Sequence, residues 1–245
     1  MENKIIDLHF RGYGNPQIAK ELGVSYSKVR KILKANSLNT SQSKWTKVSL
    51  STLDEEVLVG TLLGDASVLF KTKLSKYPSF SVAHSTKSEE YSDYKMNLIG
   101  KSLALKKRYV SHRVKGITYK SVNLESPNLP CMTIYRESFY PNGKKIVPID
   151  FMQSRFTALS LAILFMDDGT CDRRPNTTYY KIALDGLGYD EVRKFSLFLL
   201  NSFNLHTSVH KNGTLAIRSI SSDEFVRIIK PYIPNVMKYK LGGHH

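Results

Sequence analysis

Two aspartates in this sequence, Asp65 and Asp168, each end an apolar run, and the runs lie roughly 100 residues apart. Residues 57–64 and 159–166 are apolar on nearly every face, which is typical of buried helices. A carboxylate at the C-terminal end of a helix opposes the helix dipole, at a cost of about 0.3–1 kcal/mol. Either run alone would also fit a plain helix stop. Two matching ends in a basic chain predict an acidic pocket that holds a divalent metal ion.

The segments around these runs repeat one order of elements. A capping box, Thr52 to Glu55, opens the first run. Alternating and helical periodicities then predict a strand, a helix, a hairpin and a closing helix. In the first half the strand, helix and hairpin are residues 77–85, 88–105 and 108–124. In the second half the strand, helix, hairpin and closing helix are residues 179–184, 189–203, 206–220 and 222–232. Lys115-Gly116 and Asn212-Gly213 are the expected two-residue hairpin turns. The pattern predicts an α+β fold of two αββαββα units.

The charge of the chain points to a polyanionic partner. Its 245 residues include 36 Lys or Arg and 21 Asp or Glu, giving a net charge of +15 and a pI of about 9.7. Hydrophobic residues make up 41%, which is enough for a core and excludes a disordered basic tail. No apolar run reaches the ~18 residues of a membrane span. Cys131 and Cys171 form no CxxC pair, so we expect no structural zinc site.

The first 48 residues carry nine Lys or Arg and three acids, and they read as three short helices. Asn15-Pro16 would cap and begin the second helix, Gly23 would form a tight turn, and Ser25 would cap the third. This segment resembles a helix-turn-helix, whose third helix enters the major groove. We therefore expect Tyr26, Ser27 and Arg30 to contact DNA. A three-helix module that binds protein is the alternative.

The rest of the chain resembles the LAGLIDADG homing endonucleases of the monomeric, two-motif class. The first motif reads Leu58-Val-Gly-Thr-Leu-Leu-Gly-Asp65-Ala66, and the second Leu161-Ala-Ile-Leu-Phe-Met-Asp-Asp168-Gly169. Lys144-Lys145-Ile-Val-Pro148 and the segment 237–241 are also shared with a member of that class. The resemblance covers residues 50–241.

The resemblance implies a DNA-binding saddle with the two motif helices at its centre. Asp65 and Asp168 would share Mg²⁺, for which Mn²⁺ could substitute, together with the backbone carbonyls of Ala66 and Gly169. Lys145 and Lys240 match the basic residue that each half of the family site carries near the attacking water. Asp167 is expected to be a polar residue at the helix end with no catalytic part.

The polar sides of the strands would line the DNA. Strand alternation separates these sides from the apolar sides, and the expected DNA-binding residues there are Ser79, Ser81, Ser111, Arg113, Tyr119 and Asn123 in the first half and Tyr179, Lys181, Ser208, His210 and Arg218 in the second. Arg173 and Arg174, which follow the second motif, are expected to contact phosphate. His84 and His112 alternate with apolar residues, so we expect them to be core histidines rather than ligands.

The sequence therefore predicts a monomeric, Mg²⁺-dependent endonuclease that cuts a long, specific site in double-stranded DNA. The expected parts are a helix-turn-helix over 1–36, a polar linker over 37–49, half-domains over 50–148 and 149–241, and a possible tag remnant over 242–245. A non-cleaving helix-turn-helix regulator and an RNA maturase are the alternatives, and an intein-borne domain is expected less. No membrane partner is expected. The compartment would be the cytoplasm or nucleoid of a bacterium or phage host, or an organellar matrix.

Overall fold

The N-terminal segment forms a small helical module with its own core. The computed structural model describes residues 1–10, 13–38, 48–174 and 177–242, without the side chains of residues 10, 174 and 177. Helices α1 (Glu2–Phe10), α2 (Asn15–Leu22) and α3 (Tyr26–Ala35) bury Ile5, Ile18, Val29 and Leu33 against one another. Most of the predicted linker, residues 39–47, lies outside the described residues.

The predicted caps of this module are right in two cases and wrong in one. Gly23 has φ +62°, and the Ser25 side chain accepts a hydrogen bond from the Lys28 backbone N–H at 3.2 Å, so both predictions are confirmed. The residue that caps α2 is Gly14 rather than Asn15. Its backbone N–H donates to Gln17 Oε1 at 3.1 Å, and this bond places Asn15 inside the helix.

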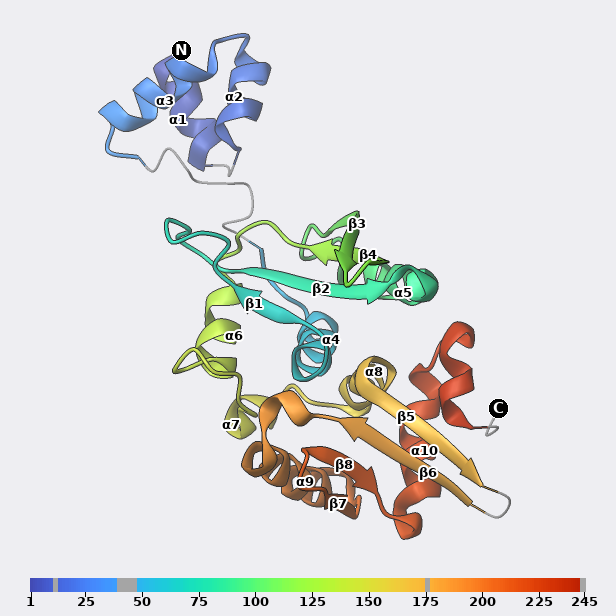
Figure 1. Ribbon diagram of the computed structural model, residues 1–245. Helices are drawn as coiled ribbons and strands as arrows, with labels where there is room; N and C mark the ends of the chain where they lie inside the picture. The colour runs from blue at the N-terminus through green and yellow to red at the C-terminus, as the bar shows by residue number, and fades with distance from the viewer. Residues whose placement is uncertain (11–12, 39–47, 175–176, 243–245) are drawn as a thin grey trace.

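The remainder of the chain repeats one αββαββα unit twice, as predicted (Figure 1). The first unit contains α4 (Thr52–Leu63), β1 (Ser67–Leu69), β2 (Ser79–Ser85), α5 (Glu89–Ile99), β3 (Lys106–Val114), β4 (Ile117–Glu125) and α6 (Met132–Phe139). After the short α7 (Ile149–Met152), the second contains α8 (Ala158–Asp168), β5 (Gly169–Arg174), β6 (Thr177–Ala183), α9 (Tyr189–Phe203), β7 (Thr207–Val209), β8 (Thr214–Ile217) and α10 (Ser222–Ile229). The two antiparallel sheets have matching strand orders, β1-β2-β4-β3 and β5-β6-β8-β7.

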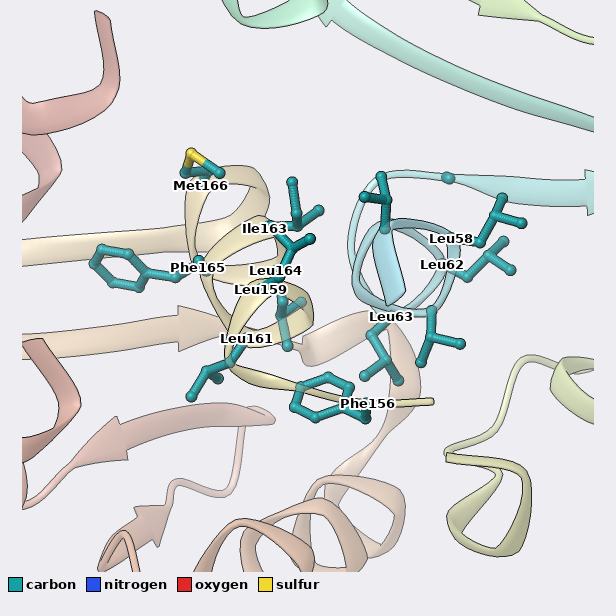
Figure 2. Packing of buried hydrophobic residues seen from close by; sticks show 14 of the residues in the cluster. Leu58, Leu62, Leu63, Phe156, Leu159, Leu161, Ile163, Leu164, Phe165 and Met166 are labelled. Carbon is teal, nitrogen blue, oxygen red and sulfur yellow. The ribbon is translucent and has the colours of Figure 1, made fainter. Parts of the chain in front are cut away.

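The motif helices α4 and α8 pack against each other at the junction of the two units (Figure 2). They lie very close at Gly60, where a Cβ would be 2.9 Å from the Cα of Ser160. The Ser160 hydroxyl donates to the Glu56 carbonyl oxygen at 2.7 Å and so ties the helices together. Leucines of both helices, with Phe156 and Phe165, join the two units into one continuous core. Because Gly60 has no side chain, the backbones come close enough to bring the two helix ends together.

The start of α4 differs from the prediction by one residue. Ser51 is the N-cap, its hydroxyl oxygen accepts from the Asp54 N–H at 3.2 Å, and Asp54 Oδ2 accepts from the Ser51 N–H at 2.8 Å. The capping box is therefore Ser51 to Asp54, not Thr52 to Glu55. Both pairs match the box pattern, and the structure uses the earlier one, which adds a residue to the helix start.

The two hairpin turns are of different kinds. Lys115 and Gly116 have φ values of +49° and +84°, which confirms a two-residue turn. In the hairpin loop of the second unit, residues 210–213, only Gly213 has a positive φ, +82°. Its N–H donates to the His210 carbonyl, and the His210 N–H donates to the Thr214 carbonyl, both at 2.9 Å. The second loop is therefore longer than the two residues predicted, with glycine as its left-handed residue.

The C-terminal end packs onto the second unit. Gly242 has φ +62° and ends the last short helix, Asn235–Leu241, and a Cβ on it would lie 2.9 Å from Thr178 Cγ2. Gly242 thus packs against the second unit, and residues 243–245 lie outside the described part, so the possible tag remnant over 242–245 stays a prediction. Cys131 and Cys171 are both free. Among the described residues, no helix is long and apolar enough to cross a membrane.

Candidate active site

The two motif aspartates meet where α4 and α8 end. Asp65 follows the last turn of α4, and Asp168 is the last residue of α8. A Cβ on Gly64, the residue before Asp65, would lie 2.9 Å from the Asp168 carboxylate oxygen Oδ2. The crossing of the helices therefore brings together two carboxylates that the sequence separates by more than a hundred residues.

The Asp168 carboxylate is partly desolvated and lies close to other negative charges. Burial, together with the negative charges of Asp65 and Asp167, raises its pKa to about 7 against the opposing charges of Lys145 and Lys240. In the part of the chain that the structure describes, no group donates a hydrogen bond to this carboxylate. A divalent cation would replace the missing compensation, and carboxylate oxygens are its preferred ligands. The residues present thus fit a divalent metal ion.

Asp65 is in a different environment. Its Oδ2 lies 3.4 Å from Nδ1 of the buried His84, and its side chain is 38% exposed. Burial alone would raise its pKa, but the hydrogen bond from His84 and the charges of His84, Lys95 and Lys240 outweigh that effect, so the pKa is lowered. Asp65 is therefore the carboxylate that ionises more easily, which also suits a metal ligand.

Lys145 and Lys240 occupy matching positions at the two helix ends. The Lys145 ammonium donates to the carbonyl oxygens of Gly64 at 2.8 Å and Ala66 at 3.4 Å. The Lys240 ammonium donates to those of Met166 at 2.6 Å and Asp167 at 3.3 Å. Each lysine thus offsets the negative end of one motif helix dipole.

Burial lowers the pKa of both lysines. For Lys145 the result is about 8, in spite of the opposing charges of Asp168, Asp65 and Asp167. The pKa of Lys240 is lowered as well, against the charges of the same three aspartates. Each ammonium is therefore held close to the acidic centre at a place where it is poorly solvated, and its charge acts strongly there.

Asp167 is a polar residue at the end of α8, as predicted, but it does not face solvent. Its side chain is fully buried and forms an ion pair with Lys95, whose Nζ lies 2.6 Å from Oδ1 and 2.9 Å from Oδ2. The Tyr91 hydroxyl donates to the same carboxylate at 2.7 Å. The prediction that Asp167 has no catalytic part is untested, but its location is beneath the centre rather than away from it.

One oxygen or nitrogen atom each from Asp65, His84 and Asp167 lies within 4.8 Å of the others, a spacing that could hold a cation. Lys95 already neutralises Asp167, however, so this set offers a metal less free charge than Asp65 with Asp168. The two predicted carbonyl ligands have different surroundings. The Ala66 oxygen accepts a hydrogen bond from Lys145, whereas Gly169 is the first residue of β5 and pairs with Ile182 of β6. The ligand roles of both carbonyls stay predictions.

Three residues near the centre were missed or misjudged in the sequence. His84 was expected in the core, and it is buried, yet it lies against Asp65. His84 lies on the buried face of β2 beside Phe80 and Val82. A titratable side chain among apolar ones was the sequence signal that could have marked it as a site residue. Lys95 and Tyr91 were not identified. Their spacing of four puts them one turn apart on a helix, but nothing in that spacing shows that Asp167 lies opposite them.

A pocket of about 210 Å³ opens beside Asp168. Lys145, Gly64 and Leu63 line it from the first unit. Residues 183–187, which follow β6, line it from the second unit. The candidate centre is therefore open to solvent on this side.

The predicted DNA-contacting residues of the first sheet do not all share one face. Pairing of Ala83 with Asn123 and of Ser81 with Glu125 puts Ser81, Tyr119 and Asn123 on the face opposite the buried Val122 and Leu124. Ser79 shares this parity but is buried, and its hydroxyl donates to the Leu69 carbonyl at 3.3 Å, so it does not line an open surface.

Ser111 and Arg113 lie on the other face, because β3 pairs Ser111 with Lys120 and Arg113 with Thr118. Their assignment to the same polar side as Asn123 was wrong by one residue of register. β3 residues with the parity of Asn123 are Lys106, Arg108, Val110 and His112. His112 is exposed and stacks on Tyr119, so the prediction that it is a core histidine was also wrong.

In the second sheet, Tyr179, Lys181 and Ser208 share the face opposite the buried Tyr180 and Ile182. His210 and Arg218 are exposed just beyond β7 and β8. Arg173 is exposed but has the parity of Cys171, on the other face, and the side chain of Arg174 lies outside the described residues. In the helical module, Tyr26, Ser27 and Arg30 are exposed at the start of α3. DNA contact by any of these residues stays a prediction.

Comparison with known proteins identifies relatives over most of the chain. A model of the LAGLIDADG DNA endonuclease family matches residues 55–228. A probable intron-encoded endonuclease 1 of Wickerhamomyces canadensis is 29% identical over 82% of this chain and 87% of its own. A cytochrome b mRNA maturase bI2 of Debaryomyces hansenii is 29% identical over 77% of this chain and 73% of its own. A solved structure of the homing endonuclease I-WcaI bound to its DNA recognition sequence superposes with a TM-score of 0.70 and 25% identity, covering 87% of this chain and 92% of that one.

Proposed function

The chain belongs to the LAGLIDADG DNA endonuclease family, and from that premise we propose that it cuts both strands of a specific DNA duplex with divalent metal ions held by Asp65 and Asp168. The observation that carries the proposal is the meeting of these two carboxylates at the paired helix ends, with Lys145 and Lys240 on either side. One chain supplies both halves of the centre, so it would act as a monomer.

The chemistry divides between the metal and the chain's own side chains. A bound Mg²⁺ or Mn²⁺ polarises a phosphate, lowers the pKa of water and stabilises a leaving oxygen. Asp65 and Asp168 would hold the ions. Lys145 and Lys240, fixed by helix carbonyls, would orient water or offset the charge that builds on the phosphate. Their poor solvation strengthens that charge interaction.

The partner that suits this centre is duplex DNA. The net charge of +15 favours a polyanion, and the polar faces of both sheets offer side chains that can contact bases and phosphates. The homing endonuclease that superposes on this chain was solved bound to its DNA recognition sequence, which supports the same class of partner here. The exposed start of α3 would add contacts outside the saddle.

The test begins with a duplex that the protein itself selects. Repeated binding selection from a randomised duplex pool in EDTA gives a bound sequence without any cleavage. That duplex is then incubated with the protein in Mg²⁺, in Mn²⁺ and in EDTA. Double-strand cuts with either metal and none in EDTA are the expected result. Tight binding without cleavage in either metal would favour the non-cleaving regulator instead.

A second candidate function is RNA maturation, because one relative is named a cytochrome b mRNA maturase. The same protein would then bind an intron RNA and promote its splicing. The discriminating assay adds the protein to transcripts of introns from relatives' host genes under conditions where the RNA does not splice alone. Faster splicing would support this role, and it would not exclude DNA cleavage.

A further inference from the structure

A buried ion pair lies directly beneath the two motif aspartates. Lys95 and Asp167 are both essentially inaccessible to solvent, at 1% and 0% side-chain exposure. Two short contacts, 2.6 and 2.9 Å, join the ammonium to the carboxylate. Tyr91 contacts both members of the pair. Its hydroxyl donates to Asp167 Oδ1 at 2.7 Å, and its ring centroid lies 4.9 Å from Lys95 Nζ. The Asp167 carboxylate is therefore held from two sides.

This group joins the two units of the fold. Tyr91 and Lys95 lie one turn apart on α5 of the first unit, whereas Asp167 belongs to the last turn of α8 in the second. The Tyr91 ring also packs on the His84 ring, with centroids 5.1 Å apart, and His84 Nδ1 approaches Asp65 Oδ2 at 3.4 Å. A continuous series of contacts thus links Asp167, which precedes Asp168, through Tyr91 and His84 to Asp65.

The pair has no counterpart at the other helix end. The residue that precedes Asp65 is Gly64, and a Cβ there would already lie 2.9 Å from both Asp167 Cβ and Asp168 Oδ2. The first motif therefore has no room for a carboxylate like Asp167. The pseudo-symmetry of the fold does not require the ion pair, and only the second motif carries it.

Stability is a weak reason for such a pair. Removing two charges from water costs about as much as their attraction returns, and apolar residues of similar size often replace a buried pair without loss. What an ion pair supplies, and an apolar pair cannot, is a fixed carboxylate orientation. It also cancels one negative charge at a place where Asp65 and Asp168 add two more.

We propose that Lys95 and Asp167 are positioning residues for the metal centre. Lys95 holds Asp167 away from the metal and fixes the end of α8, so that Asp65 and Asp168 are the carboxylates presented to the cations. This role rests on the proposed endonuclease function. It predicts that disturbing the pair changes the metal site while leaving DNA binding intact.

Two single substitutions disturb the charge in opposite senses. Lys95→Met frees the Asp167 carboxylate as an extra ligand, so the protein–DNA complex should bind Mn²⁺ more tightly. Asp167→Asn leaves the Lys95 ammonium unpaired beside Asp65, so Mn²⁺ should bind about tenfold more weakly, the lower end of the effect of supporting groups around metal ligands. Both variants should cut about 10- to 100-fold more slowly. Purely structural damage would move Mn²⁺ affinity in the same direction in both.

A double variant keeps the test decisive if the single variants unfold. Lys95→Met with Asp167→Leu removes both charges and fills the space, so its melting temperature should equal or exceed that of the wild type. Its cleavage should still be about tenfold slower, because the end of α8 has lost its fixed orientation. Lys107→Met, which breaks ion pairs between β3 and the outer side of α5, is the control and should cut normally.

The experiment uses the full chain with the duplex selected by binding, and it measures melting temperature, duplex affinity in EDTA, Mn²⁺ affinity of the complex by electron paramagnetic resonance, and cleavage. A double variant that cuts at the wild-type rate would overturn the inference. So would Mn²⁺ shifts of the same sign in the two single variants. If the wild type itself never cuts, the endonuclease proposal fails, and the signs of the Mn²⁺ shifts still decide the role of the pair.

Discussion

At the end of α4, Asp65 follows a glycine, is partly exposed, and is approached by His84. At the end of α8, Asp168 follows Asp167, which is buried against Lys95, and burial raises the pKa of Asp168 to about 7. The backbone and the lysine that caps each helix end are alike in the two units, while the charges around the two aspartates differ. The two units therefore share the geometry of the centre, while the residues around the two aspartates give its two sides different electrostatics.

The largest expected effect comes from removing either aspartate. Asp65→Asn and Asp168→Asn should each lower cleavage by about 10³-fold or more, because in the proposed centre each carboxylate would hold metal that its neighbour cannot hold alone. Affinity for the selected duplex in EDTA should change little. Rates on each end-labelled strand measure the effect, with the exposed Asp150→Asn as control. If one variant kept a tenth of the activity, the two aspartates would not act as equals.

Substituting the two lysines compares the sides more finely. Lys145→Met and Lys240→Met should each slow cleavage by about 10²-fold, the effect of losing one well-placed charge in a poorly solvated site. Both variants should still bind the duplex and metal. Single-turnover rates on each strand are the measurement, and the exposed Lys211→Met serves as control. Full activity in either variant would mean that this lysine only caps its helix and has no part in cleavage.

Gly64 is the point where the two sides touch. Gly64→Ala should slow cleavage by about tenfold, because the new Cβ would lie 2.9 Å from Asp168 Oδ2 and must displace that carboxylate. Gly186→Ala is a matched control: it lines the same pocket, yet a Cβ there meets nothing within 4 Å. Equal rates for both variants and the wild type would mean that the helix ends are further apart than we describe.

The N-terminal three-helix module, unlike the two units, is not repeated in the described chain. It has its own buried cluster, separate from the core of the two units, so deleting residues 1–45 should leave the fold of the rest intact. Affinity for the duplex should fall about tenfold near 0.15 M salt, with a smaller salt dependence, because cationic contacts are lost. Affinity measured across a salt series is the test. Unchanged affinity would remove this module from DNA binding.

The smallest effect concerns pH, and it separates Asp168 from Asp65. Since the folded-state pKa of Asp168 is about 7 against an ordinary value of 3.8 for an aspartate, the folded protein between these pH values keeps a proton that the unfolded chain has lost. The metal-free protein should therefore lose stability as pH rises from about 4 to 7. Because Mn²⁺ displaces that proton, the rise in melting temperature that it causes should grow with pH across this window. Asp168→Asn should flatten this trend, and a trend that persisted would assign it to another group.

Much of this arrangement was readable in the sequence because it is encoded locally. The two apolar runs that end in aspartate, the order of strands and helices, and the places of Lys145 and Lys240 follow from periodicity and from the family motifs. The Lys95–Asp167 pair was not readable, since its partners are 72 residues apart and meet only after the two units pack. The faces of β3 were also assigned wrongly from the sequence. Nearly all its residues are exposed on both faces, so no apolar alternation marks which face carries Ser111 and Arg113.

The most direct test of the central claim is the location of the metal. A crystal of the full chain with its selected duplex and Mn²⁺ can be measured at a wavelength where manganese scatters anomalously. The account predicts manganese within about 2–2.5 Å of carboxylate oxygens from both Asp65 and Asp168. Manganese bound instead among Asp65, His84 and Asp167, with none on Asp168, would contradict it.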